Sequence, residues 1–384
     1  MSFEFTTASR IIFGRGCAAR IGEEAAALGQ RVFVLTGRQS DRWEFLWRDL
    51  QGRPLRWQQF AISGEPSIEM IALAAEAAQH AAVDVVIGIG GGSVIDAAKA
   101  VAAKVVNPGD LLDYLEVIGR GRTLAQPSLP CIAVPTTAGT GAEVTRNAVL
   151  RSEEHGVKVS LRSPTMLPVL ALVDSDLTLS VPPGVTAATG MDALTQLLEA
   201  FVSRRANPLT DGICREGLAR AARSLEQAFG QGDNVDARED MALASLFGGL
   251  ALANAGLGAV HGFAGPLGGM RPAAHGMICA ALLPEVMAAN IRVLGWRHPG
   301  HFALERYRET AVLLTGRERA RPEDGVDWVR QLGRRLAVSS LGALGFKADH
   351  TDEAVAKARQ ASSMKGNPVD LTEEELAGIF RNAL

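Results

Sequence analysis

Short apolar runs alternate with amphipathic stretches over the first 180 residues of the chain. Five runs rich in Val, Ile and Leu predict β-strands, at residues 10–14, 31–37, 84–90, 130–137 and 170–174. Amphipathic stretches between them predict helices, at residues 17–29, 67–82 and 91–104. The run DVVIGIG at 84–90 is apolar throughout, as expected for a parallel strand that is covered on both faces. This alternation indicates an α/β layered domain.

The pattern changes at the segment VPPGVTAATG. From about residue 184 the apolar positions follow a helical period, with many Ala and Leu residues and few β-branched runs. A chain of 384 residues is also long for a single core. We therefore predict an α/β domain over residues 1–181 and an all-α domain over residues 182–384, with the boundary near Pro182.

Composition excludes several functional classes. The net charge is −3 and no basic stripe is present, so we expect no nucleic acid partner. The 4 cysteines are scattered without CxxC spacing, which is typical of reduced thiols in the cytoplasm. The N-terminus lacks the pattern of a signal peptide, and no apolar run reaches the roughly 18 residues of a membrane span. We therefore expect a cytoplasmic protein with no membrane partner.

The segment GIGGGSVIDAAKA, residues 88–100, follows a predicted strand and opens a predicted helix. Gly90, Gly91 and Gly92 allow unusual backbone angles and a close approach of the main chain to a ligand. Ser93 either caps the helix or donates to an anion, and the first helical N–H groups would bind a pyrophosphate. Ser93 also occupies the last glycine position of GxGxxG, so that fingerprint is not matched. The alternative is a tight strand–helix turn with no ligand.

Two further segments bear on a cofactor. In PTTAGTGAEVT, residues 135–145, the hydroxyls of Thr136, Thr137 and Thr140 can line a nicotinamide or phosphate cleft, or satisfy their own backbone in turns. After the strand at 31–37, Gly37 and Arg38 stand where an acidic residue often binds the ribose 2′-hydroxyl. An arginine there accommodates a 2′-phosphate, which favours NADP over NAD, although an exposed loop arginine is an equal alternative.

Four polar residues in the second half of the chain suggest a metal site. Asp192 and Gln196 lie four residues apart, which places both on one helical face. His261 and His275 can complete a cage for a divalent ion. Gln196 stands where a stronger ligand is expected. Taken singly, each residue also has a structural explanation, such as a carboxylate in the first turn of a helix or a histidine satisfied within a core.

Several of these motifs occur in the order found in one known family. The chain resembles the iron-containing (group III) alcohol dehydrogenases over essentially its whole length. The matching segments are GEP (64–66), GGGSVIDAAKA (90–100), PTTAGTGAEVT (135–145), GMDALTQLLEAFVS (190–203) and HGFAGPLGG…AHG (261–276). The resemblance implies a nucleotide-binding α/β domain followed by a helical metal and substrate domain, in a dehydroquinate synthase-like architecture with the active site in the cleft between them. It also implies NAD(P)-dependent interconversion of a small alcohol and an aldehyde or ketone, in a homodimer or larger assembly.

The resemblance assigns roles to individual positions. It makes Asp192, His261 and His275 metal ligands at the catalytic centre. It places Gly91, Gly92 and Ser93 at the pyrophosphate, with Thr136, Thr137 and Thr140 in the adjoining cofactor loop. Lys158 matches a lysine near the cofactor ribose. NAD-preferring members commonly have aspartate at position 37, so Gly37 again favours NADP.

Two positions depart from the family pattern. Gln196 replaces the second ligand, usually histidine, and Gly265 replaces a histidine usually found four residues after His261. An amide oxygen is a weak donor for a transition metal. Whether a metal is bound is therefore open at this point, and so is the choice among iron, zinc and manganese, because all three tolerate a mixed oxygen–imidazole shell. Two alternatives also stay open: a metal-independent reductase of the maleylacetate reductase type, and a non-redox nucleotide-binding relative.

Overall fold

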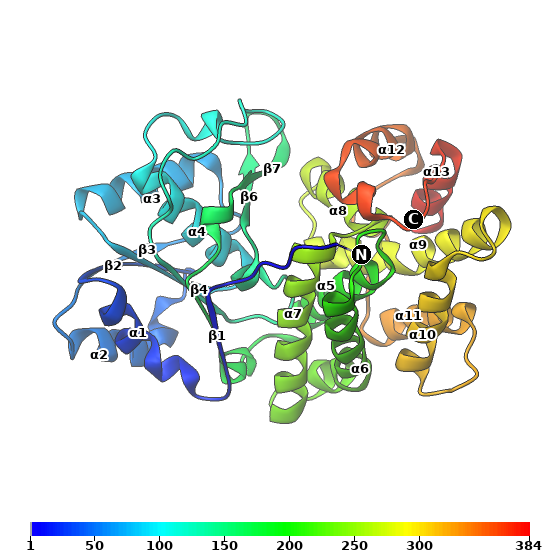
Figure 1. Cartoon of the computed structure of the whole chain (residues 1–384), viewed down its shortest axis with the longest axis horizontal. Coiled ribbons are helices and arrows are strands. Elements are labelled where there is room, and N and C mark those ends of the chain that lie inside the picture. Colours follow the sequence, from blue (N-terminus) through cyan, green and yellow to red (C-terminus); the bar gives the residue numbers. More distant parts are fainter. Residues whose placement is uncertain (1) are drawn as a thin grey trace. The chain divides into compact units, whose positions relative to one another are not determined.

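The computed structural model describes residues 2–384, and the chain divides into two compact units (Figure 1). The α/β unit comprises Thr7–Thr137 and Gly141–Thr178. The helical unit comprises the N-terminal segment up to Thr6, the short segment Ala138–Thr140, and Leu179–Leu384. Each unit is thus built from segments that are separated in sequence.

A 6-stranded parallel sheet forms the centre of the α/β unit, in the order β1-β8-β5-β4-β2-β3. Its strands are β1 Arg10–Phe13, β2 Arg31–Thr36, β3 Arg56–Ala61, β4 Val85–Gly90, β5 Cys131–Pro135 and β8 Leu170–Val173. The helices between them are α1 Ile21–Leu28, α2 Glu44–Gln51, α3 Ile68–His80 and α4 Gly92–Val106. A separate antiparallel hairpin is made by β6 Asn147–Ser152 and β7 Val157–Arg162.

Helices cover both faces of this sheet (Figure 1). Successive residues of a strand point to opposite faces. Accordingly Phe33 of β2 packs with α3 and α4, whereas its neighbours Val32 and Val34 pack with α1 and α2. Every residue of β4 is buried, because this strand is central and covered on both sides. The α/β expectation from the apolar runs is therefore confirmed.

The structure also contains strands that the apolar runs did not reveal. β3 is the edge strand and reads RWQQFA, with polar residues at its centre. In the hairpin, β6 reads NAVLRS and alternates buried and exposed positions, but its apolar residues do not follow that alternation, because Val149 is exposed and Ser152 is buried. Its three consecutive apolar residues, Ala148 to Leu150, are fewer than the four or so that indicate a strand.

The helical unit contains nine α-helices among the residues that the structure describes. They are α5 Pro183–Val202, α6 Pro208–Gly230, α7 Val235–Ala255, α8 Ala259–Met270, α9 His275–Arg297, α10 Phe302–Thr315, α11 Pro322–Arg335, α12 Thr351–Gln360 and α13 Glu373–Asn382. Helix α5 is central, packs against α6, α7 and α9, and is buried along almost its whole length. Its polar residues are therefore held inside the unit, which is unusual unless they are paired or bind a ligand.

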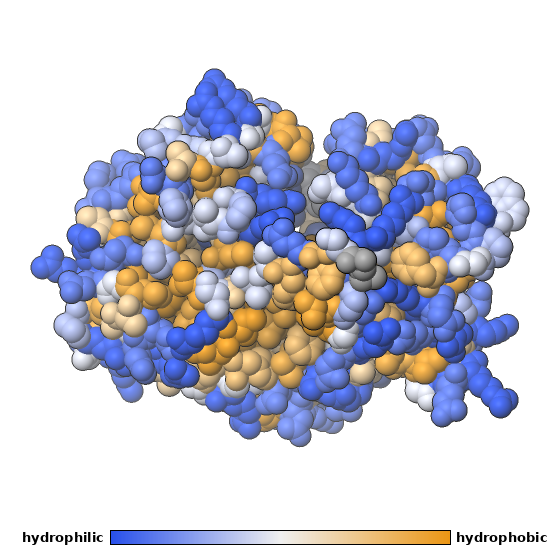
Figure 2. Space-filling model, in the orientation of Figure 1, coloured by the Kyte–Doolittle hydropathy of each residue, from blue (hydrophilic) through white to orange (hydrophobic). Residues whose placement is uncertain are grey.

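Helix α9 has the length and apolar composition of a membrane span, contrary to the expectation that no segment reaches that limit. The bent pair α7 and α8 passes the same criterion when taken together. However, 67% of the apolar stretch of α9 is buried within the unit, where Leu282, Leu283 and Leu294 belong to the core. The apolar character of α9 is thus explained by its place in the core. Polar residues, blue in Figure 2, cover much of the surface in that view.

Candidate active site

The strand order of the sheet reverses between β2 and β4, so a topological switch point lies at their carboxyl ends. These two strands are neighbours, but α2, which follows β2, packs on one face of the sheet, and α4, which follows β4, packs on the other. Ligands of open α/β sheets bind at such a switch point, because the diverging helices leave a crevice above the strand ends. Gly37 and Gly91 follow directly after these two strands, so the predicted cofactor segments lie where this fold places a nucleotide.

The glycine loop serves close packing as well as ligand approach. A Cβ on Gly90 would lie 2.6 Å from Val94, and one on Gly88 would lie 2.7 Å from Ala98, so both glycines let α4 approach β4. At Gly91 an added Cβ would lie 3.4 Å from Thr137 Oγ1. Gly90, Gly91 and Gly92 do not have positive φ angles. The expectation of unusual backbone angles is therefore wrong at these three positions.

Helix α4 begins without a side-chain cap. Its N-cap is Gly91, and Ser93 lies inside the first turn, so the expected capping role of Ser93 is not observed. The first N–H groups of a helix have no intrahelical partner, and they carry the positive end of the helix dipole. An uncapped N-terminus of this kind suits an anion such as a pyrophosphate.

The segment PTTAGTGAEVT, predicted to line the cofactor, is held by a buried lysine of α4. Lys99 is fully buried, and its Nζ donates to Ala142 O at 2.9 Å and Thr145 Oγ1 at 3.0 Å, and also to Asn147 O. It also pairs with Asp96 Oδ1 at 2.8 Å. A single ammonium group thus fixes the second half of this segment and the start of β6. Of the three threonines predicted for the cofactor loop, Thr136 and Thr137 belong to the α/β unit and Thr140 to the helical unit.

Glu143 in this loop predicts a dependence of stability on pH. Burial raises its pKa to about 7, against the smaller effects of its own backbone hydrogen bond and of Lys99. Between its ordinary pKa of 4.5 and about 7, the folded chain keeps a proton that the unfolded chain releases, so stability falls as pH rises through this window. We expect Glu143→Gln to stabilise the α/β unit at pH 8 by up to about 3 kcal/mol, with little change near pH 4.

Urea unfolding midpoints at both pH values measure this effect. The exposed Glu153→Gln is the matched control and should change neither midpoint. An equal shift of the Glu143→Gln midpoint at both pH values would contradict the assignment.

Gly37 and Arg38 lie in open surroundings at the end of β2. A Cβ on Gly37 would have no neighbour within 4 Å. The guanidinium of Arg38 is exposed and donates from Nε to Ser63 Oγ at 2.7 Å. Lys158, on β7, is ion-paired with Glu65 of the GEP segment. This ion pair joins two positions that match the family pattern and lie 93 residues apart in the sequence.

The predicted metal ligands converge inside the helical unit. Nε2 of His261 lies 3.2 Å from Asp192 Oδ1, and Nε2 of His275 lies 3.9 Å from the same oxygen. Asp192 is 3% exposed and His261 9% exposed. A fourth side chain, Cys279, joins this group: the donor atoms of Asp192, His261, His275 and Cys279 all lie within 4.8 Å of one another. We refer to these four residues as the donor cluster.

Glu199 orients one imidazole of the donor cluster. Its Oε2 lies 2.7 Å from His261 Nδ1, and its Oε1 accepts from Val260 N at 2.7 Å. Nε2 of His261 is thereby turned toward Asp192, which is the arrangement of a histidine ligand with a supporting carboxylate. Burial would lower the pKa of His261, but Cys279 and the hydrogen bonds with Asp192 and Glu199 hold it well above its ordinary value. Burial likewise opposes the ionisation of Asp192, yet its contacts with His261 and His275 bring its pKa below the ordinary value.

Gln196 lies beside the donor cluster, but its amide oxygen is turned toward a neighbouring helix. Nε2 donates to Asp192 Oδ2 at 3.2 Å. The amide oxygen Oε1 is buried and has no hydrogen-bond partner, and a Cβ on Gly248 of α7 would lie 3.1 Å from it. Since only nitrogen can donate to a carboxylate, this contact fixes which side of the amide faces Asp192.

Sequence reasoning missed Glu199 and Cys279, although both follow the spacing that revealed the others. Glu199 lies seven residues after Asp192, and Cys279 lies four residues after His275. Residues at these separations share one face of a helix. Extending the helical period in both segments would therefore have found them. Gly265, the other departure from the family pattern, leaves open space: a Cβ there would have no neighbour within 4 Å.

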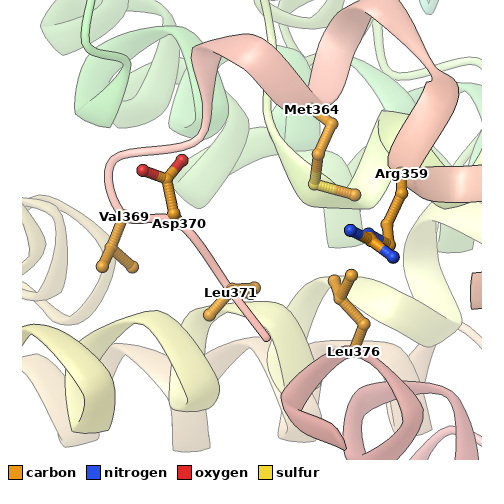
Figure 3. A pocket seen from close by; sticks show the side chains of 6 residues that line it. All are labelled: Arg359, Met364, Val369, Asp370, Leu371 and Leu376. Atoms are coloured by element: carbon orange, nitrogen blue, oxygen red, sulfur yellow. The ribbon is translucent and has the colours of Figure 1, made fainter. Parts of the chain in front are cut away.

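The cavity in Figure 3 lies elsewhere in the helical unit and contains no member of the donor cluster. Arg359, Met364 and Leu376 point into it from three different elements. Its volume of about 120 Å³ is small for a dinucleotide. Met364, which lines this cavity, packs closely against Gly262, next to His261: a Cβ on Gly262 would lie 2.8 Å from Met364 Cε.

Comparison with known proteins decides the family. Residues 8–175 match the family described as iron-containing alcohol dehydrogenase, and residues 186–384 match the C-terminal part of the Fe-containing alcohol dehydrogenase family. The chain belongs to the iron-containing alcohol dehydrogenase family. It is therefore a nicotinamide-dependent oxidoreductase that interconverts an alcohol and a carbonyl compound, and membership implies a divalent metal.

Several relatives of this alcohol dehydrogenase support the assignment. The probable alcohol dehydrogenase EutG of Salmonella typhimurium is 36% identical over 83% of this chain and 78% of its own length. The 1,3-propanediol dehydrogenase of Klebsiella pneumoniae is 37% identical over 78% of this chain and 76% of its own. A solved 1,3-propanediol oxidoreductase has a TM-score of 0.93 at 31% identity, covering 100% of both chains. The sulfoacetaldehyde reductase of Bifidobacterium kashiwanohense, solved with NAD+, has a TM-score of 0.87 at 28% identity, covering 99% of this chain and 98% of its own.

Proposed function

We propose that this alcohol dehydrogenase carries out metal-assisted hydride transfer between NADP(H) and a small alcohol or aldehyde, as a cytoplasmic enzyme. The convergence of Asp192, His261 and His275 carries the proposal, since a buried carboxylate and two imidazole Nε2 atoms at 3.2 and 3.9 Å from it form a donor set that fits a divalent ion. The 4 free cysteines support a reducing compartment. The named substrates of the relatives, 1,3-propanediol and sulfoacetaldehyde, support small alcohols and aldehydes as a class.

Each residue has a role that follows from its contacts. A divalent ion supplies a Lewis acid that polarises a carbonyl oxygen or lowers the pKa of an alcohol. Asp192 supplies negative charge to hold that ion, and Glu199 holds the His261 ring so that Nε2 faces the donor cluster. The N-terminus of α4 binds the pyrophosphate, and Arg38 at the end of β2 binds the ribose phosphate. When bound, the nicotinamide would supply the hydride chemistry.

One experiment tests the reaction and the need for metal together. Protein purified without chelator is analysed for iron, zinc and manganese, then assayed with NADPH and NADH against a panel of small aldehydes. We expect one equivalent of metal, and loss of activity on chelation that returns with metal. Full activity without metal would instead support the metal-independent reductase. That alternative is favoured by one observation: Gln196, Asp192 and His261 already form a hydrogen-bonded chain with one another. No nicotinamide oxidation with any aldehyde would refute both.

The cofactor choice is tested at Gly37. We expect Gly37→Asp to reverse the preference from NADPH to NADH, lowering kcat/KM for NADPH by about 10²-fold. The position accepts a side chain because an added Cβ meets nothing within 4 Å. A carboxylate there repels a 2′-phosphate, but accepts a hydrogen bond from a 2′-hydroxyl.

Steady-state kinetics with both cofactors measure this change, and Gly37→Asn is the control. The asparagine adds equal volume without charge, so it should weaken NADPH much less than aspartate does. A wild-type enzyme that already prefers NADH would show that the inference from Arg38 is wrong.

The homo-oligomeric assembly implied by the family resemblance stays a prediction.

A further inference from the structure

We propose that the Cys279 thiolate is the fourth protein ligand of the metal, and that Gln196 is not a ligand. This inference rests on the proposed function in one respect, the presence of a divalent ion among Asp192, His261 and His275. It concerns which side chain completes the ligand set. The thiol of Cys279, one helical turn beyond His275, takes the place of the weak amide donor Gln196.

The position of the sulfur supports this assignment. Cys279 Sγ lies 3.7 Å from His275 Nε2 and 3.8 Å from His261 Nε2. Bonds of about 2.0–2.1 Å to nitrogen or oxygen and about 2.3 Å to sulfur, at tetrahedral angles, separate neighbouring donor atoms by about 3.3–3.6 Å. The sulfur-to-nitrogen distances in the donor cluster are thus close to those of a ligand set. Cys279 is fully buried, so it faces the cluster and not solvent.

The orientation of Gln196 in this structure does not present a donor atom to the same set. Its amide nitrogen faces the cluster and donates to Asp192 Oδ2, and a nitrogen that donates a proton in this way has no lone pair for a metal. The oxygen that could bind is buried against Gly248, 3.1 Å from where a Cβ would stand, and has no partner. Gln196 is therefore a positioning residue, which holds the carboxylate of Asp192 from the side opposite the histidines.

The chemistry of the exchange is balanced and changes the metal preference. On binding, the S–H bond of Cys279 breaks, a sulfur–metal bond forms, and the proton is released to solvent. A divalent ion deprotonates a coordinating thiol outright. The carboxylate and the thiolate then neutralise the two positive charges of the ion, whereas a site with a neutral amide or imidazole keeps one. Because thiolate is a soft ligand, we expect zinc to be retained in preference to iron(II).

X-ray absorption at the zinc edge tests the ligand directly, without reference to activity. In the wild-type protein loaded with zinc, we expect one sulfur scatterer at about 2.3 Å in addition to nitrogen and oxygen at about 2.0–2.1 Å. The cobalt(II)-substituted protein should show a sulfur-to-metal charge-transfer absorption in the near ultraviolet. Both signals should vanish in Cys279→Ser, with at least about 10-fold weaker zinc binding.

Two variants serve as controls. Cys214 on α6 is fully buried, as Cys279 is, but lies outside the donor cluster, so Cys214→Ser should keep both signals. Gln196→Leu should also keep the sulfur scatterer, with zinc bound more weakly because Asp192 loses its hydrogen bond. Wild-type spectra with only nitrogen and oxygen scatterers would overturn the inference even if Cys279→Ser failed to fold.

The outcomes separate this inference from the function on which it rests. Stoichiometric zinc without a sulfur scatterer, in an active enzyme, refutes Cys279 as a ligand and leaves metal-assisted hydride transfer standing. Absence of stoichiometric zinc, with full activity after chelation, refutes the metal-assisted mechanism itself. A sulfur scatterer that persists in Cys279→Ser assigns the signal to another thiol, and also refutes the inference.

Discussion

Asp192→Asn should abolish metal retention and lower kcat by at least about 10²-fold, since loss of a supporting residue alone costs 10- to 100-fold in metal affinity. Asp192 is the carboxylate of the donor cluster, and one of its oxygens faces both histidines. Asparagine keeps the shape of the side chain but removes the negative charge that holds a dication within a buried site. Elemental analysis of the purified variant and nicotinamide-linked aldehyde reduction measure the two effects.

The control for this prediction is Asp236→Asn, an exposed carboxylate in the first turn of α7. It should leave both metal content and rate unchanged. Stoichiometric metal in Asp192→Asn would remove Asp192 from the ligand set, and the assignment of the remaining donors would then have to be reconsidered.

The largest effect on stability is expected at Lys99. Lys99→Met should destabilise the α/β unit by about 3–5 kcal/mol, because it leaves Asp96 and the acceptors of the loop at 142–147 without the ammonium group that they surround. Methionine is nearly as long as lysine and apolar, so the change removes the interactions and leaves little empty volume. The melting transition should fall by on the order of 10 °C.

Lys104 provides the comparison for this variant. It lies on the same helix and contacts a single acceptor, Asn107 O, at 3.2 Å, so Lys104→Met should shift the transition much less. Equal melting temperatures for the two variants would show that the Lys99 network contributes no net stability. Weaker NADPH binding in Lys99→Met, measured below its transition, would further show that the loop after Thr137 depends on this lysine.

These two lysines also show how far sequence patterns reach. In GGSVIDAAKAVAAK both appear as polar positions of an amphipathic helix, yet Lys99 is fully buried, whereas Lys104 is only partly buried. The acceptors that make burial possible are 43 to 48 residues away, in a loop whose path depends on tertiary structure. The inner strands β2, β4, β5 and β8, by contrast, were predictable, because burial on both faces requires apolar residues throughout, whereas the edge strand β3 is half polar and was not.

The candidate metal site could likewise be predicted only in part. The sequence showed that Asp192 and Gln196 share one face of a helix, because they are four residues apart. The sequence could not show that Nε2 of His261 faces Asp192. That orientation depends on where the fold places the start of α8, and on the hydrogen bond of Glu199 to the other ring nitrogen. The same limit applies to Gln196: its position is evident from the chain, but the direction of its amide is set by Asp192 and by the space above Gly248.

The discontinuous helical unit also dictates an order of events during synthesis. Thr6 exchanges two hydrogen bonds with the side chain of Asn254, at 2.6 and 2.9 Å, and belongs to that unit. It leaves the ribosome 248 residues before its partner. The parallel sheet can form first, because domains generally fold as units during translation. Thr6 cannot pair with Asn254 until that residue has been synthesised. A large tag fused close to Thr6 would therefore interfere with a late step in the folding of the helical unit.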